Sequence, residues 1–204
     1  RNDADYVLLL NNDTIVQSDF LTKLLKGATS SNNIGITGAK IYYYDEPNML
    51  WFNGGTFNEW FGRTTHIKKE TTKDTSTCSF ITGCCMLIKK DVFKKIGLLD
   101  ESYFMYVEDL DYCYRARKAG FILNVAHKSI IWHKVGASND GELSEFAVRY
   151  MVKNHYKFIK KLGGLQKYCA FVSFTIFRIL SMIKWTLKGK PNIAKIQLHA
   201  IIKR

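Results

Sequence analysis

The chain has 204 residues, of which 47% are hydrophobic, and carries a formal net charge of +12 at pH 7. This length and hydrophobic content suffice to bury the core of one good-sized domain, which excludes a disordered chain. The five cysteines are odd in number and show no CxxC or CxH spacing, so the pattern indicates reduced, mostly buried thiols in a cytosolic setting and neither a disulfide framework nor a zinc knuckle.

Strand and helix patterns alternate along the first half of the chain, which favours an α/β layered domain. An apolar run at residues 6–10 predicts a strand, and Ser18 can cap a helix that runs to about residue 30. We expect a second strand at 34–44 and a hairpin or binding loop around the paired glycines of 51–69. An exposed loop is expected at 70–77. Because the strand pattern begins a few residues after Arg1, we expect a fragment whose upstream part is missing.

The second half continues the alternation. The expected elements are a buried strand at 78–88, a short helix that stops at Gly97, a helix from about 107 to 120, one or two strands ending at His133, and helices at 142–162 and from 163 to about 188. We expect two parts, a catalytic-type domain over residues 1–162 and a helical tail over residues 163–204.

Three polar residues, Asn11, Asn12 and Asp13, directly follow the first strand in the stretch YVLLLNNDT. Open α/β sheets place their ligands at the carboxyl ends of their strands, so Asp13 is a candidate site residue. A hairpin turn explains the same polar residues equally simply.

Glu108, Asp109 and Asp111 fall within the first turns of one expected helix. Acids at a helix N-terminus interact favourably with the helix dipole, and Asp111 with Arg115 makes a stabilising i,i+4 pair. The aromatic segment SYFMYV precedes them, however, which favours the edge of a partly dry pocket, where a carboxylate can accept a proton.

His133 ends an apolar run, where a structural role and a ligand role are both open. Trp51 offers a flat apolar face for a ligand, or packs in the core. Gly54, Gly55 and Gly83 allow the backbone to approach a ligand closely, or serve turn geometry alone. Arg115 is a further candidate ligand-binding residue.

The order of LLLNNDT, WFNGG, ITGCCMLIKKDVFKKIGLLDESYFMYVEDLDYCYRARKAGF and IIWH resembles the second half of a family 2 glycosyltransferase, particularly its rhamnosyltransferase-like members. The resemblance covers roughly residues 3–160, and LLDESYFMYVEDLDYCYRARKAG is its most specific part. It implies a GT-A (Rossmann-like) fold for nucleotide-diphospho-sugar transfer, with the nucleotide-binding half expected upstream of Arg1.

The resemblance also implies site residues. Asn11-Asn12-Asp13 stands where the family has its DxD-type motif, with Asn in place of the first Asp, so Asp13 is the motif's one ionised metal ligand. His133 matches the distal metal-binding histidine, and Asp109 matches the catalytic base. Glu108 and Asp111 would then position donor, acceptor or base.

This resemblance implies an inverting transferase that moves rhamnose or another hexose from a nucleotide-sugar donor to a glycan or lipid-linked acceptor in cell-surface polysaccharide synthesis. A divalent cation, Mn²⁺ or Mg²⁺, neutralises the diphosphate leaving group, and carboxylate, imidazole and water suit these ions. A carboxylate takes the proton of the acceptor hydroxyl as it attacks. One in-line displacement inverts the anomeric centre without a glycosyl-enzyme intermediate.

The basic excess lies in the tail, because residues 149–204 hold 13 of the 30 Lys and Arg and none of the 18 Asp and Glu. On a helix, Lys167, Arg178, Ser181, Lys184 and Lys188 share one arc, with Phe171, Phe174, Phe177 and Leu180 away from it. The apolar run 168–183 is shorter than a spanning helix needs. We expect a helix lying on an anionic membrane surface, peripheral to the cytoplasmic face of the cell membrane. Ordinary packing on the domain is the alternative.

Two other functions stay open. A nucleic-acid-binding protein could use the basic tail with its interleaved Tyr and Phe, but this leaves the acid cluster unexplained, and we expect no nucleic-acid partner. A non-catalytic, membrane-associated scaffold with a decayed transferase domain is compatible with the Asn-substituted motif.

Overall fold

The computed structural model describes residues 4–135 and 144–202, which separate into two compact units. Unit 1 comprises Arg1–Thr56, Thr65–Asp100 and Glu108–Val135, and unit 2 comprises Phe57–Thr64, Glu101–Val107 and Gly136–Arg204. The expected boundary at 162–163 stays a prediction. Helix α4 (Glu145–Ile159) and two short segments from earlier in the chain belong to the same unit as the tail helices.

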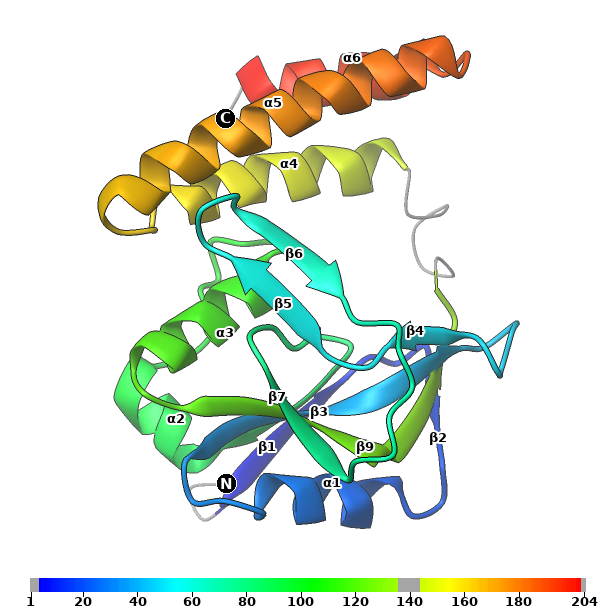
Figure 1. Ribbon diagram of the computed structural model, residues 1–204, viewed down its shortest axis with the longest axis vertical. Coiled ribbons are helices and arrows are strands. Elements are labelled where there is room, and N and C mark those ends of the chain that lie inside the picture. The colour runs from blue at the N-terminus through cyan, green and yellow to red at the C-terminus, as the bar shows by residue number, and fades with distance from the viewer. Residues whose placement is uncertain (1–3, 136–143, 203–204) are drawn as a thin grey trace. The chain divides into compact units, whose positions relative to one another are not determined.

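Unit 1 is built on a mixed sheet whose strands follow the order β1-β8-β3-β9-β2, with β4 paired to β3 and β7 paired to β9 (Figure 1). The bounds are β1 Tyr6–Leu10, β2 Thr14–Val16, β3 Ile34–Tyr43, β4 Leu50–Phe52, β7 Thr75–Cys78, β8 Cys85–Lys89 and β9 Ile122–His133. A separate hairpin is formed by β5 (Gly55–Asn58) and β6 (Arg63–His66).

Helices cover both faces of this sheet. Helix α1 (Phe20–Ala28) packs on β3 and β9, where a Cβ on Gly27 would come within 2.6 Å of the Ala126 Cβ. On the opposite face, Gly38 of β3 meets Ile81, whose backbone N and O both bond to Cys113 Sγ of α3 (Glu108–Lys118). Helix α2 (Lys90–Ile96) follows β8 directly and buries Val92. The sheet core is thus buried on both sides.

Most expected elements of unit 1 are confirmed, but several features differ. The N-cap of α1 is Asp19 and not Ser18, and strand β2 was not expected. A strand, β7, occupies the end of the expected loop at 70–77, because its residues pair with β9 from Thr75 to Cys78. The expected strand at 78–88 begins only at Cys85, because the residues before it leave the sheet: Phe80 N donates to Gly55 O of β5, and Ile81 and Gly83 bond to residues of α3. In the described chain β1 lies at one end of the sheet order, with Val7 and Leu10 41% and 39% exposed.

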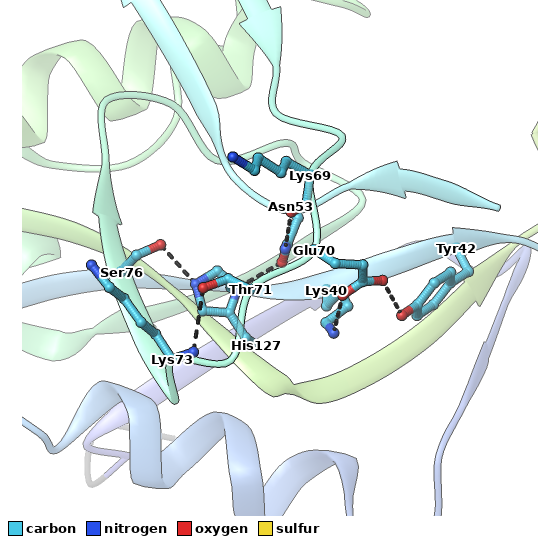
Figure 2. Close-up of polar contacts among 9 residues, drawn as sticks. All are labelled: Lys40, Tyr42, Asn53, Lys69, Glu70, Thr71, Lys73, Ser76 and His127. Atoms are coloured by element: carbon cyan, nitrogen blue, oxygen red, sulfur yellow. Dashed lines mark hydrogen bonds and ion pairs between the residues drawn. The ribbon is translucent and has the colours of Figure 1, made fainter. Parts of the chain in front are cut away.

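Polar side chains connect the sheet with residues 67–76, which include the loop between β6 and β7 (Figure 2). The buried ring of His127 bridges Asn53 Oδ1 at 2.6 Å and Ser76 Oγ at 2.7 Å. Nearby, Glu70 accepts from Lys40 Nζ at 2.9 Å and from the Tyr42 hydroxyl at 2.6 Å. These bonds lower the pKa of Glu70, so the carboxylate stays ionised and holds the loop.

Unit 2 contains α4, α5 (Gly164–Leu187) and α6 (Pro191–Ile202). Helix α4 buries His155 and Tyr156 against α5. The His155 ring stacks on the Phe174 ring with 4.2 Å between ring centres, and Tyr156 Oη forms a hydrogen bond with Thr175 Oγ1 at 2.9 Å. The sequence reasoning placed no separate helix at α6. Pro191 is the local signal for it, since proline is well suited to a first helical position.

The exposed face of α5 differs from the expected one. Phe174 is only 2% exposed, and the Arg178 guanidinium lies over the rings of Phe174 and Phe177 at 4.8 and 5.0 Å, so these side chains face the protein. Of the expected apolar face, Leu180 is exposed. The other exposed large apolar side chains of α5 are Leu165, Tyr168, Val172, Ile176, Ile179, Ile183 and Leu187. At 24 residues, α5 is also long and apolar enough to cross a membrane, which corrects the expectation of a shorter run.

Candidate active site

Strand direction brings the candidate residues to one edge of the sheet in unit 1. Strand β8 is antiparallel to both β1 and β3, and β3 is parallel to β9, so β1, β3 and β9 all point the same way. The carboxyl end of β1 leads into Asn11, Asn12 and Asp13, and β9 ends at His133. Because Leu10 pairs with Cys85, the residues just before β8, Gly83 and Cys84, lie at the same edge.

Asp13 and His133 meet at this edge. After β1 the chain turns and enters β2, whose first residue Thr14 pairs with His133, and Lys134 N donates to Asp13 O at 3.0 Å. This register places Asp13 Oδ1 3.2 Å from His133 Nε2, with the two side chains 16% and 10% exposed. The hairpin-turn interpretation and the site interpretation of YVLLLNNDT are therefore compatible, because the turn itself delivers Asp13.

The other members of this turn are exposed. Asn11 N donates to Cys84 O at 3.0 Å, and Thr14 Oγ1 donates to Asn11 O at 2.7 Å, which fixes the turn backbone. The side chains of Asn11 and Asn12 are both exposed, so their predicted contact with a donor or acceptor stays a prediction.

The Asp13–His133 pair provides one carboxylate and one imidazole for a divalent cation. Within residues 4–135 and 144–202 no group of three or more His, Cys, Asp or Glu is placed to hold a metal. Mg²⁺ and Mn²⁺ sites commonly use one or two protein ligands together with water and substrate phosphates, so two donors suit a cation shared with a diphosphate. The donor set fits such an ion, and a closed all-protein cage is not formed by the described residues.

The acid pair begins helix α3. Asp109 Oδ2 accepts from Gly83 N at 2.8 Å, and its Oδ1 accepts from Leu110 N at 2.7 Å. A Cβ added at Gly83 would be 3.4 Å from the Asp109 Cβ, which is at the edge of ordinary van der Waals contact. Glu108 Oε2 is buried without a hydrogen-bond partner. Two backbone N–H groups therefore orient the Asp109 carboxylate, whereas Glu108 Oε2 has no such hydrogen bond.

Burial raises the pKa of both carboxyls. For Glu108 burial and the neighbouring Asp109 charge raise the pKa to about 7. For Asp109 burial also raises the pKa, and the Gly83 and Leu110 N–H groups work against that rise. Because N–H donors favour the charged form, Asp109 is the member that keeps the negative charge, beside a Glu108 that is partly protonated near neutral pH.

The dipeptide Gly83–Cys84 joins the two acid sites. Gly83 N holds Asp109, and Cys84 O holds the turn that carries Asp13. The pKa of the Cys84 thiol is raised chiefly by burial, and the charges of Cys85, Asp13 and Asp109 add to the rise, which places the thiol near both acids. From the sequence, Cys84 is expected only as a reduced, buried thiol within the strand at 78–88, and the role of its backbone carbonyl has no sequence signal.

Asp111 and Arg115 make different contacts. Asp111 is fully buried and its Oδ2 accepts from Arg115 Nε at 2.8 Å. The other guanidinium nitrogens of Arg115 donate to Ile96 O and Leu98 O at 2.8 and 3.0 Å, at the end of α2. The structure thus confirms the i,i+4 pair as a brace between α3 and α2 and does not bring it to the Gly83–Cys84 dipeptide. Its roles in binding or positioning stay predictions.

Trp51 joins the site, whereas the paired glycines serve packing. The Trp51 ring lies edge-on to His133 at 4.8 Å and to His66 at 5.1 Å. Gly54 has φ of 106°, and a Cβ on Gly55 would come within 2.6 Å of Phe80 Cδ1. Turn geometry and packing therefore account for both glycines, and their contact with a sugar stays a prediction.

Comparison with known proteins agrees with this geometry. The family model described as "Glycosyltransferase like family 2" matches residues 2–152. A hexosyltransferase of low-salt glycan biosynthesis, Agl10 of Haloferax volcanii, is 56% identical over 36 residues, which are 18% of this chain and 12% of that protein. The N-acetylglucosaminyl-diphospho-decaprenol L-rhamnosyltransferase of Mycobacterium tuberculosis is 32% identical over 81 residues, 39% of this chain and 26% of the relative.

A longer match is the rhamnosyltransferase WbbL of Escherichia coli, at 25% identity over 78% of this chain and 63% of WbbL. The chain thus spans less than two thirds of each of these relatives. Among solved structures, GalNAc-T7, crystallised with UDP, GalNAc and Mn²⁺, superposes with a TM-score of 0.59 at 14% identity, over 80% of this chain and 32% of that one. That likeness and the family match confirm the GT-A fold. With its family model covering the sheet, the acid pair and the Asp13–His133 edge, the chain belongs to the glycosyltransferase like family 2.

Proposed function

We propose that the protein is an inverting, metal-dependent glycosyltransferase that moves rhamnose or another hexose from a nucleotide-diphosphate donor to a glycan or lipid-linked acceptor. The observation that carries this proposal is the Gly83–Cys84 dipeptide, which bonds Asp109 on one side and the turn bearing Asp13 on the other. A proton acceptor and a cation-binding pair at one edge are the two elements that transfer from a diphosphate leaving group needs.

Asp109 serves as the general base. As the acceptor hydroxyl attacks the anomeric carbon, its oxygen forms the new glycosidic bond, the bond from that carbon to the diphosphate breaks, and the hydroxyl proton passes to Asp109. The Gly83 N–H at 2.8 Å fixes the carboxyl orientation, and burial raises the Asp109 pKa toward the working pH. Attack opposite the leaving group inverts the anomeric centre.

Asp13 and His133 hold the divalent cation, Mn²⁺ or Mg²⁺. When bound, the ion supplies positive charge that stabilises the departing diphosphate. Trp51, edge-on to His133 at 4.8 Å, fixes the imidazole ring and offers an apolar face beside it. In this proposal the two cation ligands, Asp13 and His133, and the base, Asp109, lie around the Gly83–Cys84 dipeptide.

The relatives support the choice of substrates. Two are named rhamnosyltransferases and one a hexosyltransferase of glycan biosynthesis, and the mycobacterial name includes an acceptor linked to diphospho-decaprenol. A similar lipid-linked acceptor here would place the enzyme in cell-surface polysaccharide synthesis. Supply of nucleotide sugars favours the cytoplasmic face of the membrane.

The exposed row of α5 is the proposed membrane contact. Its apolar side chains face away from the buried Ala170 and Phe174, and Trp60 and Phe61 of the β5–β6 turn line one apolar groove with Tyr168, Cys169, Val172, Ser173 and Ile176. Lys184, Lys188 and Lys190 are exposed near the end of this row. An apolar face flanked by cations favours peripheral binding to an anionic bilayer, with a spanning α5 as the alternative outcome.

Asp109→Asn should lower kcat by about 10² to 10⁴, because Asn accepts the Gly83 hydrogen bond but takes no proton. The measurement is sugar transfer by the full-length protein, with the product anomer assigned by NMR. Asp91→Asn, an exposed acid in the first turn of α2, is the matched control. Unchanged transfer by the Asp109 variant would remove Asp109 from the base role, and absence of transfer by the native protein would favour the scaffold.

Glu108→Gln should leave the acidic limb of the kcat/KM profile in place. The base must be unprotonated, so the rate falls as pH drops through the pKa of Asp109, and a protonated Glu108 has no charge that opposes this ionisation. A pH–rate series from about pH 5 to 9 measures the limb. A limb that moves to lower pH in the variant would reverse the order in which the two carboxyls lose their protons.

The same variant gives a stability readout. The folded-state pKa of Glu108, about 7, lies above that of an unfolded glutamate, so its contribution is present at low pH and is lost as pH rises through about 7. The melting temperature of Glu108→Gln should therefore change less between about pH 5 and 8 than that of the native protein.

Asp13→Asn and His133→Ala should each raise the Mn²⁺ concentration for half-maximal transfer by at least about tenfold. Direct Mn²⁺ binding in the presence of a nucleoside diphosphate, followed by electron paramagnetic resonance, reports the same loss without turnover. His66→Ala removes another ring that contacts Trp51 and serves as the control. Equal Mn²⁺ affinity in all variants would exclude this pair as the cation site.

Replacing Val172, Ile176 and Ile183 together by Gln should weaken binding to anionic phosphatidylglycerol vesicles by more than about tenfold, because three half-exposed aliphatic side chains leave the bilayer. Co-sedimentation measures the loss, and Leu98→Gln, 71% exposed in unit 1, is the control. Resistance of the native protein to alkaline extraction would indicate a spanning α5. Pelleting with oligonucleotides and not with vesicles would favour the nucleic-acid alternative.

A further inference from the structure

Two consecutive residues before the acid pair have an unusual backbone. Tyr106 and Val107 have φ of 66° and 76°, and they are the two non-glycine residues with positive φ within residues 4–135 and 144–202. The left-handed region disfavours side chains with a Cβ, and a β-branched valine there is a genuine outlier. Such strain persists only when surrounding contacts hold it, and it concentrates at functional sites.

Asn154 of α4 supplies contacts of this kind. Its side chain is 3% exposed, and Nδ2 donates to Met105 O at 2.7 Å and to Tyr106 O at 3.1 Å. Those two carbonyls belong to the peptide groups just before the strained φ angles of Tyr106 and Val107. One amide group therefore fixes the orientation of both peptide planes.

The neighbouring α4 contacts are of another type. Lys157 reaches the Ser102 hydroxyl, and its Nζ lies 4.4 Å from the centre of the Tyr103 ring, so it binds side chains of the same segment. Asn154 instead binds the backbone, directly next to the start of α3. Glu108 follows Val107 by one peptide bond, so the direction in which the chain leaves Val107 sets the first turn that carries Asp109.

We propose that Asn154 is a positioning residue for the catalytic base. It holds Tyr106 and Val107 in the left-handed conformation that delivers the Asp109 carboxyl to the Gly83 N–H. The proposal rests on the proposed function in that Asp109 is the base. Small misplacements of a catalytic group carry large costs in rate, so a residue that never touches substrate can control kcat.

The chemistry of the side chain is specific. Both carbonyls need a donor, which an amide NH₂ group supplies with two hydrogens and a carboxylate lacks. Asn154→Asp would set an acceptor against two acceptors, and Asn154→Ala would leave two part-buried carbonyls without this partner. Both changes favour release of the strained conformation.

The test uses the full-length protein and the variant Asn154→Ala. We expect kcat to fall by about 10- to 100-fold with donor KM within about twofold, because positioning and not donor binding is lost. The acidic limb of the pH–rate profile should move to higher pH, because the Gly83 N–H no longer favours the ionised Asp109. A purely structural role in α4 would leave that limb in place.

A second substitution tests the strain directly. Val107→Gly removes the conflict between φ of 76° and a β-branched side chain. The double variant Asn154→Ala/Val107→Gly should therefore regain at least about threefold of the kcat lost in Asn154→Ala. It also provides a second protein for measurement where Asn154→Ala alone folds poorly. Lys153→Ala, exposed and adjacent on α4, is the matched control.

Hydrogen exchange separates this proposal from the proposed function. Asn154→Ala should speed exchange of the Gly83 amide and of the amides at 106–109, whether or not the protein transfers sugar. Loss of transfer in Asp109→Asn, together with native kcat, pH limb and Gly83 exchange in Asn154→Ala, would overturn the positioning role alone. Native transfer in Asp109→Asn would overturn the base assignment and with it the catalytic part of this proposal.

Discussion

The hydrogen bond from Gly83 N–H to Asp109 is the constraint on which the candidate site depends. It joins the start of helix α3 to the residues before β8, and the next residue, Cys84, accepts a bond from the turn after β1. A Cβ at position 83 would lie 3.4 Å from the Asp109 Cβ, at the edge of ordinary van der Waals contact, so Gly83 contributes chiefly its backbone N–H. Gly55 differs, because a Cβ there would come within 2.6 Å of Phe80 Cδ1.

Strand direction explains why so few residues assemble the site. Since β1, β3 and β9 run the same way, one sheet edge collects the polar residues after β1 and the histidine that ends β9. The return strand β2 then fixes the register by pairing Thr14 with His133. Asp13 and His133 are 120 residues apart in the chain, yet the pairing of β2 with β9 brings them together.

Sequence patterns predicted the parts of this structure that depend on local order. The strand at 6–10, the acids opening α3 and the histidine ending β9 follow from apolar periodicity and motif resemblance. Phe174 was assigned to the wrong face of α5, because helical periodicity shows that a helix has two faces and not which one meets α4. The strained φ angles of Tyr106 and Val107 have no sequence signal at all, since neither residue favours that conformation.

The two kinds of acid at this edge have opposite requirements, which the fold meets by separating them. In the proposed function Asp13 is a cation ligand that must stay ionised, and it lies 3.2 Å from the imidazole that would share the ion. Asp109 is the proposed base, which must take and return a proton, and burial raises the pKa of both Asp109 and Glu108. Were the acids in contact, each charge would oppose the other's ionisation. The Gly83–Cys84 dipeptide stands between them and lets each keep its own environment within one small site.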